Sequence, residues 1–248
     1  MSSQKTTEPG VGSIGDGIHA GPAEWHFNGE TPKHFSTHIL RSVPDYNAGH
    51  SLIEEISDFF IRSDSVAYEI GTATGTLLRK LANRHSSGPR WIGIDIEKDM
   101  IEQALKEHEA CNSQGNIKYV VADACEIDYE PSDFFVSYYT VQFIPPKRRQ
   151  ALINEIYKSL NWGGAFLMFE KVRAPDARFQ DIASALYVDF KLRNGYSTHE
   201  IIGKSQSLRC VLEPFSTSGN LEMLRRAGFV DIMTMYKHIC FEGFMAIK

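Results

Sequence analysis

The stretch Ser65-Val-Ala-Tyr-Glu-Ile-Gly-Thr-Ala-Thr-Gly75 decides the fold of this chain. It begins as a short run of β-branched and aromatic residues, changes abruptly to small residues, and leads directly into a helical pattern over 76–84. This order predicts a strand, a glycine turn and a helix, which together form the first βα unit of a nucleotide-binding α/β sheet. Gly71 and Gly75 allow a ligand to approach the backbone closely, because neither residue has a Cβ.

The residues around this turn favour one class of nucleoside ligand. A dinucleotide turn has the pattern G-x-G-x-x-G, whereas Ala73 stands at the middle position here. Glu69, just before the turn, would repel a pyrophosphate but would accept a hydrogen bond from a ligand ammonium group. Asp95 ends the next apolar run, where a carboxylate suits a ribose diol. We therefore predict an S-adenosyl-L-methionine (SAM) site; the alternative is a doubly wound sheet whose turn binds nothing.

The composition limits the partners of the chain. Its 248 residues suffice for one large domain with a buried core, and 42% hydrophobic and 23% charged residues are typical of a soluble globular protein. A net charge of −5 argues against a nucleic-acid partner. The widely spaced cysteines, the absence of a signal sequence and the absence of a membrane-length apolar run predict a cytoplasmic protein without a membrane partner.

The order of patterns predicts a single SAM-dependent domain over 23–248, preceded by a flexible tail over 1–22. We expect a helical lid within 25–62 and a helical insertion over 174–216 that caps the ligand crevice. The predicted strands are 66–70, 91–95, 117–122, 133–142, 165–171, 229–236 and 239–247, and the remaining helices are 76–84, 99–109, 146–160 and 218–227. The predicted fold class is α/β, with a doubly wound, seven-stranded, mostly parallel sheet of the Rossmann-like type, carrying that lid and an insertion after strand five.

Ligands of such sheets bind outside the carboxyl ends of the strands, and this rule identifies candidate site residues. They are Gly71, Thr72 and Ala73 for the methionine part, Asp95 and Ile96 for ribose and adenine, Asp123 and Ala124 for adenine, and Tyr138, Tyr139, Thr140 and Gln142 nearest the sulfonium. The alternative for each aspartate is a helix N-cap, and for the tyrosine pair a place in the core.

Several other patterns have simpler interpretations. No carboxylates follow the fourth strand, where catechol-type methyltransferases hold Mg²⁺, so we predict no metal site. His34 and His38 stand at the i, i+4 spacing of metal ligands, but no third ligand is near and a solvated helix face is favoured. His26 either lines the crevice or packs between its aromatic neighbours. The basic run over 145–149 is also interpreted as a solvated face.

The chain also resembles a known family, the carboxy-S-adenosylmethionine synthases, which supply the carboxymethyl donor for wobble-uridine modification of tRNA. The similarity runs through 27–46, Tyr68-Glu-Ile-Gly-Thr72, Leu160-Asn-Trp-Gly-Gly-Ala165 and Asn194-Gly-Tyr-Ser197. The resemblance implies a class I methyltransferase fold that is often dimeric through its inserted helices. It also implies that the SAM-derived ligand contacts Tyr46, Gly71 to Ala73, Asp95, Ile96, Asp123, Ala124 and Tyr138.

One departure from the family affects the expected reaction. The synthases hold the extra carboxylate of their product with an arginine in the cap, and the matching residue here is Ser205. Lys204 or Arg209 could replace that arginine as the cation, but with a different hydrogen-bonding geometry. The chain is also similar to relatives that methylate small aromatic amino acids. We therefore favour a SAM-dependent methyltransferase acting on a small aromatic or amino-acid-derived metabolite. Carboxy-SAM synthesis from prephenate and a SAM-binding protein without transfer activity are the alternatives. The candidate substrate contacts are His26, Tyr139, Tyr196 and His199.

Overall fold

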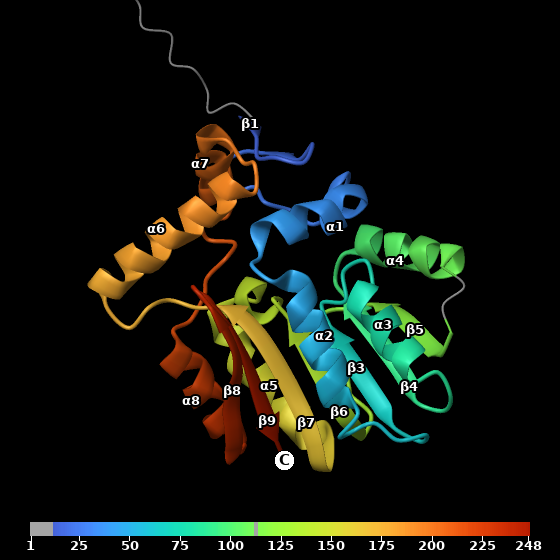
Figure 1. Cartoon of the computed structure of the whole chain (residues 1–248). Helices are drawn as coiled ribbons and strands as arrows, with labels where there is room; N and C mark the ends of the chain where they lie inside the picture. The colour runs from blue at the N-terminus through green and yellow to red at the C-terminus, as the bar shows by residue number, and fades with distance from the viewer. Residues whose placement is uncertain (1–11, 112–113) are drawn as a thin grey trace, which may run out of the picture.

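The computed structural model describes residues 12–111 and 114–248, and its centre is a seven-stranded sheet of order β5-β4-β3-β6-β7-β9-β8 (Figure 1). The strands are β3 Val66–Ile70, β4 Arg90–Asp95, β5 Asn116–Val121, β6 Ser132–Tyr138, β7 Leu160–Lys171, β8 Asp231–His238 and β9 Phe241–Ile247. The first five pair in parallel with one another, and β9 pairs antiparallel with both β7 and β8. The chain proceeds outward from β3 to β5 and then returns to β6 on the other side of β3. The ligand crevice of such a sheet lies at this reversal.

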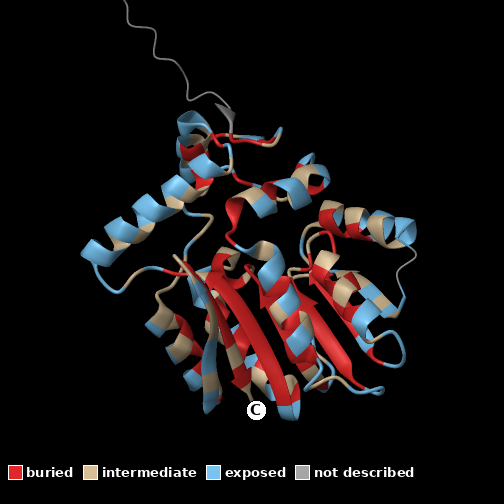
Figure 2. Cartoon of the chain, in the orientation of Figure 1, coloured by how far each residue is buried: buried red, intermediate tan, exposed pale blue. Residues whose placement is uncertain are grey.

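Helices cover both faces of the sheet because its central strands are apolar on both sides. All five residues of β3 are buried, and Figure 2 shows the central strands as the most continuously buried part of the chain. On one face α2 (Tyr46–Ser57) and α3 (Thr76–Arg84) contribute Ile53 and Leu78 to the core. On the other, α5 (Pro146–Ser159) and α8 (Thr217–Ala227) contribute Ile153 and Met223. Helix α4 (Lys98–Ala110) contacts β4 and β5. The predicted fold class is confirmed.

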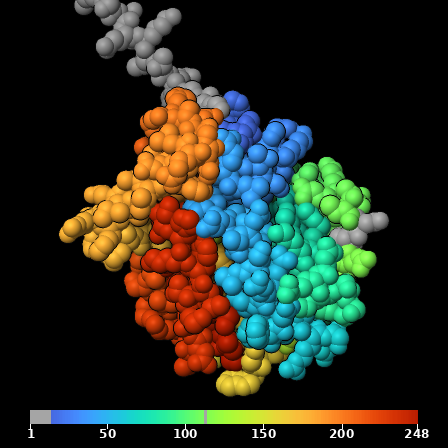
Figure 3. Space-filling model, viewed as in Figure 1, coloured from blue at the N-terminus to red at the C-terminus, as the bar shows by residue number. Residues whose placement is uncertain are grey.

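Two further groups of elements lie beyond the carboxyl ends of the strands (Figure 1). The lid consists of a hairpin, β1 (Gly12–Ser13) with β2 (His19–Ala20), and helix α1 (Thr31–Ser42). The cap consists of α6 (Ala177–Arg193) and α7 (Thr198–Ser207). The backbone N–H groups of Ala23 and Trp25 donate to carbonyls at the end of α7, at 3.0 and 3.2 Å. The surfaces of lid and cap consequently meet above the sheet, as the blue and orange atoms of Figure 3 show.

The structure differs from the expected elements at the start of the chain. Residues 12–22 belong to the lid and bury Ile14 and Ile18 beside Trp25, whereas composition predicted a flexible tail; the tail's first eleven residues lie outside the described part of the chain. Two isoleucines among glycine and serine form no periodic pattern. Their burial depends on contact with the cap, and local sequence does not contain that information.

Two strands differ from the expected bounds by more than two residues at one end. Strand β6 ends at Tyr138, because Tyr139 takes a left-handed φ of 62° and a 3₁₀ turn, η1 (Val141–Phe143), follows. Strand β7 begins at Leu160, so the Asn161-Trp-Gly-Gly164 segment expected to separate helix from strand is part of the strand itself. Within the described ranges, no helix combines the length and apolar character needed to cross a membrane.

Candidate active site

A cavity of about 370 Å³ opens at the carboxyl ends of β3, β4, β5 and β6, under the lid and the cap. This volume falls in the range of small-molecule sites. Its walls come from several sources that are far apart in the sequence. The strand tips contribute Gly71, Asp95, Asp123 and Tyr138; the lid contributes Trp25, Phe27 and His38; the start of α2 contributes Tyr46; the cap contributes Tyr187 and Lys204; and β7 and β9 contribute Lys171 and Phe241.

The glycine turn is tied to the tip of β4. The N–H groups of Gly71 and Thr72 both donate to the Ile94 carbonyl, at 2.8 and 3.0 Å, and the Ala73 N–H donates to Asp95 Oδ2 at 2.9 Å. Gly71 has a φ of +71°, and a Cβ at this position would overlap the Thr140 side chain. This backbone conformation therefore requires glycine, and the lack of a side chain allows Thr140 to pack directly against the turn.

A buried carboxyl group stands beside this turn. Glu69 is 3% exposed and accepts a hydrogen bond from Thr72 Oγ1 at 2.6 Å. Burial raises its pKa to about 8, so the free protein holds a neutral carboxyl group there at pH 7. A second, smaller cavity of about 30 Å³ lies between Glu69, the turn, Tyr46 and Tyr138. A cationic group of a ligand in this space would meet the carboxyl group directly.

Asp95 and Ile96 form the second strand tip. Asp95 accepts from the backbone N–H groups of Ala73 and Glu97, each at 2.9 Å, while burial raises its pKa to about 6. Glu97 is the N-cap residue of helix α4, so Asp95 does not have the helix-capping role of the alternative interpretation. Ile96 lines the cavity with 63% of its surface exposed. An apolar surface of that size beside a carboxylate suits a flat, partly apolar ligand group such as a base.

Asp123 at the third strand tip is already paired. Its Oδ1 accepts from the Cys125 N–H at 2.9 Å, and its Oδ2 accepts from Arg148 Nη1 at 2.7 Å. Burial alone would raise the pKa of this carboxyl group, but the Cys125 N–H and Arg148 outweigh that effect and hold the pKa below its usual value. Arg148 also lines the cavity and binds Glu126 through Nη2 at 3.0 Å. Asp123 would therefore contact a ligand as a charged carboxylate that is already paired with Arg148.

The fourth strand tip presents two tyrosines held in fixed positions. The Tyr138 hydroxyl donates to the Tyr46 carbonyl at 2.7 Å, and the Tyr139 N–H donates to the Phe169 carbonyl at 2.8 Å. Gln142 braces the turn by donating to the Tyr139 carbonyl at 3.1 Å and accepting from the Lys171 N–H at 2.9 Å. A left-handed tyrosine is strained, and strain of this kind persists where the surroundings enforce it. The same brace positions Lys171 on the cavity wall.

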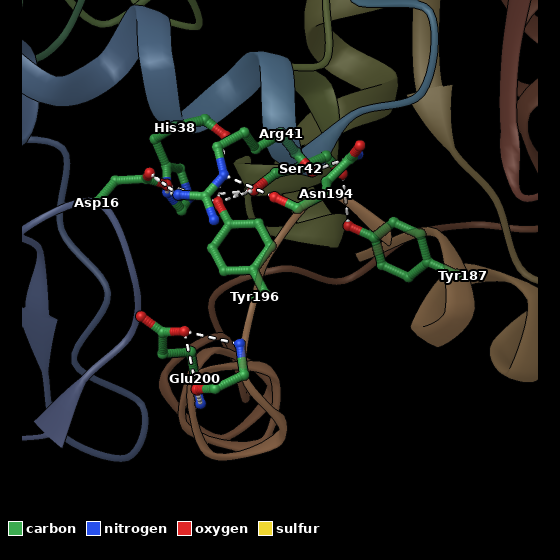
Figure 4. A network of polar contacts seen from close by, with 9 residues as sticks. Asp16, His38, Arg41, Ser42, Tyr187, Asn194, Tyr196 and Glu200 are labelled. Carbon is green, nitrogen blue, oxygen red and sulfur yellow. Dashed lines mark hydrogen bonds and ion pairs between the residues drawn. The ribbon is translucent and has the colours of Figure 1, made fainter. Parts of the chain in front are cut away.

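A polar network closes the cavity where lid meets cap (Figure 4). The Tyr196 hydroxyl of the cap donates to Asp16 at 2.7 Å, and Asp16 also pairs with Arg41 and with His38 Nδ1, the latter at 2.9 Å. Arg41 Nε in turn donates to the Asn194 carbonyl at 2.9 Å. Burial lowers the pKa of His38 to about 3, so this imidazole is neutral at pH 7. The residues of this network hold the lid against the cap.

The structure brings most of the predicted site residues together. His26, Tyr46, Gly71, Ala73, Asp95, Ile96, Asp123, Ala124, Tyr138, Tyr139, Thr140 and Gln142 line the larger cavity, and Glu69 and Thr72 line the smaller one. Two candidates lie elsewhere: Tyr196 is buried in the network just described, and His199 is exposed on α7.

Two further expectations from sequence were wrong. His38 is buried against Asp16, whereas its spacing from His34 favoured a solvated face. Arg149 is also buried, and its guanidinium donates to three backbone carbonyls, whereas the basic run around it favoured a solvated face. The partner of His38 comes from the preceding hairpin, and among the partners of Arg149 the Glu213 carbonyl comes from a distant part of the chain.

Sequence reasoning missed a group of cavity residues supplied by the second half of the fold, namely Arg148, Lys171, Tyr187 and Phe241. One signal could have identified Lys171, because it ends the fifth strand and the strand-tip rule applies to that strand as well. No comparable local signal marks Tyr187 or Phe241. They reach the cavity only through the placement of α6 and β9.

Comparisons with known proteins agree with this architecture. A family model described as a methyltransferase domain matches residues 67–164. The carboxy-S-adenosyl-L-methionine synthase of Staphylococcus epidermidis is 36% identical over 228 residues, which cover 92% of this chain and 98% of that protein. The enzyme of the same name from Nitratiruptor is 33% identical and covers 94% of this chain and 98% of its own.

Solved structures share the fold at much lower sequence identity. An O-methyltransferase family protein from Burkholderia thailandensis superposes with a TM-score of 0.62 at 14% identity, covering 88% of this chain and 59% of that one. Phosphoethanolamine N-methyltransferase 2 of Haemonchus contortus, in complex with S-adenosyl-L-methionine, superposes with a TM-score of 0.60 at 15% identity, covering 90% and 58%. This chain therefore spans less than two thirds of both solved chains, and the likeness concerns the fold alone.

Proposed function

This chain belongs to the carboxy-S-adenosyl-L-methionine synthase family of SAM-dependent class I methyltransferases, and from that premise we propose that it transfers the methyl group of SAM to a small aromatic or amino-acid-derived acceptor. One observation carries the proposal. The cavity does not end at the strand tips but continues past Tyr138 and Tyr139 to Tyr187 and Phe241, between aromatic walls. A second reactant has space there, and such space argues against a SAM-binding protein without transfer activity.

The residues at the strand tips fit SAM. The buried Glu69 carboxyl beside the smaller cavity suits the ammonium group of the methionine part, which would stabilise its charged form. Asp95 suits the ribose hydroxyls, and the exposed Ile96 suits one face of the adenine. Gly71 lines both cavities, and its positive φ shapes the turn beside which the methionine part would lie.

Methyl transfer from SAM requires little acid–base catalysis by the protein. SAM supplies an already activated methyl group: a lone pair of the acceptor forms the new bond to the methyl carbon, and the electrons of the breaking C–S bond remain on sulfur. Burial raises the pKa of Tyr138 and of Tyr139, so both phenols stay protonated at neutral pH and neither serves as a base. Their rings can stabilise an adjacent cation by about 0.5–2 kcal/mol. The main contribution of the chain is alignment of the acceptor and exclusion of water by the lid and cap.

A second candidate is carboxy-SAM formation, and the names of the relatives favour it. In that reaction SAM itself gains a carboxyl group, which prephenate supplies. The resemblance matches the family's carboxylate-binding arginine to Ser205, which is exposed on α7 and is not among the residues that line the described cavity. The arginine that lines the described cavity, Arg148, is engaged by Asp123 and Glu126. The cavity therefore lacks a free guanidinium fork for a carboxylate, and we favour methyl transfer.

Mass spectrometry separates the two reactions. The purified protein would be incubated with SAM and a panel of aromatic amino acids and phenols, and in parallel with SAM and prephenate. We expect an acceptor in the first arm to gain the mass of a methyl group while S-adenosylhomocysteine accumulates. A nucleoside that gains the mass of a carboxyl group in the second arm, with no methylated acceptor in the first, would overturn the proposal.

The matched control for both arms is Asp95→Ala, which removes the proposed ribose contact. Calorimetry with SAM and with S-adenosylhomocysteine establishes separately whether the strand-tip site binds the nucleoside. If neither ligand gives heat with the unmodified protein, the assignment of the site itself fails.

A further inference from the structure

Three lysines gather at the cap end of the cavity, and the proposed reaction does not use them. Lys171 ends β7, Lys191 lies on α6 and Lys204 lies on α7. Lys191 and Lys204 are each only 8% exposed, and Lys171 and Lys204 line the cavity itself. Three cationic side chains from separate elements thus converge on one region with little access to bulk solvent.

None of these lysines is neutralised by a protein carboxylate. Over residues 12–111 and 114–248, no hydrogen bond or ion pair involves the Nζ atom of any of the three. Their ammonium groups lie over aromatic rings instead: Lys171 and Lys191 lie 4.2 and 4.6 Å from the centre of the Tyr187 ring, and Lys204 lies over Trp25. The rings attract a cation but carry no charge to balance it.

The nearby charges do not balance the lysines either. Lys191 is repelled by Lys171, and Lys204 is repelled by Lys191. Asp16 attracts Lys204, but its carboxylate already binds Tyr196, His38 and Arg41. Burial lowers the pKa of all three ammonium groups, that of Lys191 to about 8. A carboxylate from outside the chain would compensate for this burial and favour the charged form of each ammonium group.

We propose that Lys171 and Lys204 bind a carboxylate group of the small molecule that occupies the cap end of the cavity, with Lys191 adding positive potential behind them. Buried charges are normally paired, and two unpaired lysines that line a cavity from separate elements form a receptor for an anion. Trp25 and Tyr187 also line the cavity beside the two ammonium groups, and aromatic walls there suit a flat ring attached to that carboxylate.

This inference rests on the proposed function, because it assigns the acidic group to a reactant of the same site. The carboxylate has two possible sources: the methyl acceptor, or a carboxylated methyl group on the nucleoside. Lysines bind it as point charges with rotatable donors rather than as a bidentate fork, so they tolerate either position. Separate binding measurements distinguish the two sources.

The first measurement tests an acidic acceptor. Protein saturated with S-adenosylhomocysteine would be titrated with phenylpyruvate and phenylacetate, and with phenylacetamide as a neutral analogue. We expect the acids to bind at least about tenfold more tightly than the amide, because a charged hydrogen bond contributes about that factor. Lys171→Met and Lys204→Met should each remove most of this preference. Lys158→Met, on an exposed side chain of α5 that is 76% accessible, is the matched control and should change nothing.

The second measurement tests a carboxylated donor, by comparing carboxy-SAM with SAM on the free protein. A preference for carboxy-SAM that disappears in Lys171→Met and Lys204→Met would place the carboxylate on the nucleoside and also support the receptor. If the unmodified protein binds S-adenosylhomocysteine but shows no preference for the anion in either measurement, the lysine receptor is overturned while the SAM site stands. If S-adenosylhomocysteine does not bind, the proposed function fails first.

Thermal unfolding of the free variants supplies an independent readout. Methionine resembles lysine in length but has no charge to bury, so Lys204→Met should unfold at the same temperature as the unmodified protein or higher. Phenylpyruvate should raise the unfolding temperature of the unmodified protein more than that of the variant. A lysine with only a structural role would give the opposite pattern, in which the variant is destabilised and anion binding is retained.

Discussion

Replacing Glu69 by glutamine should change the proton balance of SAM binding. Burial raises the pKa of this carboxyl group to about 8, so about nine tenths of the free protein carries it in the neutral form at pH 7. An ammonium group placed beside it favours the carboxylate and therefore expels the proton. Glutamine matches the shape of the neutral carboxyl group but has no proton to release. The variant should fold normally and bind SAM more weakly.

The structure gives the size of the effect. At pH 7 Glu69 should release about 0.9 proton per SAM bound, and Asp95, whose pKa burial raises to about 6, should release about 0.1 if its carboxylate binds the ribose. Because the free protein holds more protons than the complex, SAM affinity should rise with pH up to about pH 8 and fall above it, where SAM loses the proton of its own ammonium group. Between pH 6 and pH 8 the ionisation of Glu69, set against the partial loss of the ligand's ammonium charge, should raise the affinity about 25-fold.

Calorimetry in buffers of different ionisation enthalpy measures this release directly. The dependence of the observed heat on the buffer gives the number of protons, and the difference between the unmodified protein and Glu69→Gln should be about 0.9 at pH 7. S-adenosylhomocysteine keeps the ammonium group and lacks the methyl group, so it should release the same number. Equal proton release by the two proteins, or an affinity that does not change between pH 6 and pH 8, would refute the assignment of Glu69.

Three further substitutions test other parts of the site. Asp95→Asn should weaken SAM binding about 10- to 100-fold in calorimetry, through loss of a charged acceptor, and an unchanged affinity would contradict the ribose assignment. Gly71→Ala places a Cβ against the Thr140 side chain at a φ of +71°. The substitution should lower the free energy of unfolding by at least about 1–2 kcal/mol and abolish SAM binding. Normal binding would show that the turn does not hold the ligand. Tyr196→Phe removes the hydroxyl that donates to Asp16. In a denaturant titration this variant should lose about 1–3 kcal/mol of its free energy of unfolding while it retains its affinity for SAM. A selective loss of affinity would mean that Tyr196 contacts the ligand.

The sequence predicted the parts of the site that depend on local order. Strand β3 and helix α3 have the predicted bounds, because an apolar strand, a glycine turn and a helix are all encoded within one short segment. The residues at the ends of β3, β4 and β5 follow from the same rule. Once the strands are located, parallel pairing brings Gly71, Asp95 and Asp123 to one edge without further information.

The sequence did not predict features that depend on contacts between distant segments. The sequence favoured a solvated helix face for His38, because its partner Asp16 lies in a hairpin whose own pattern is not periodic. The insertion offered Tyr196 as a substrate contact, whereas in the structure its hydroxyl group is hydrogen-bonded to Asp16 and Ser42 of the lid. The first contact joins two parts of the lid and the second joins lid and cap, and in neither case does one segment predict the other.

The kind of cation at the cap end bears on what the site can bind. An arginine would offer a carboxylate a rigid fork at one position, whereas the cations that line the cap end here are lysines on β7 and α7. Two separated point charges impose less geometry on an anion and leave the space between them to an aromatic body. The same lysines are therefore compatible with a planar aromatic acid held beside the methyl group, and for this reason the acceptor panel in the mass-spectrometric experiment should consist first of aromatic acids.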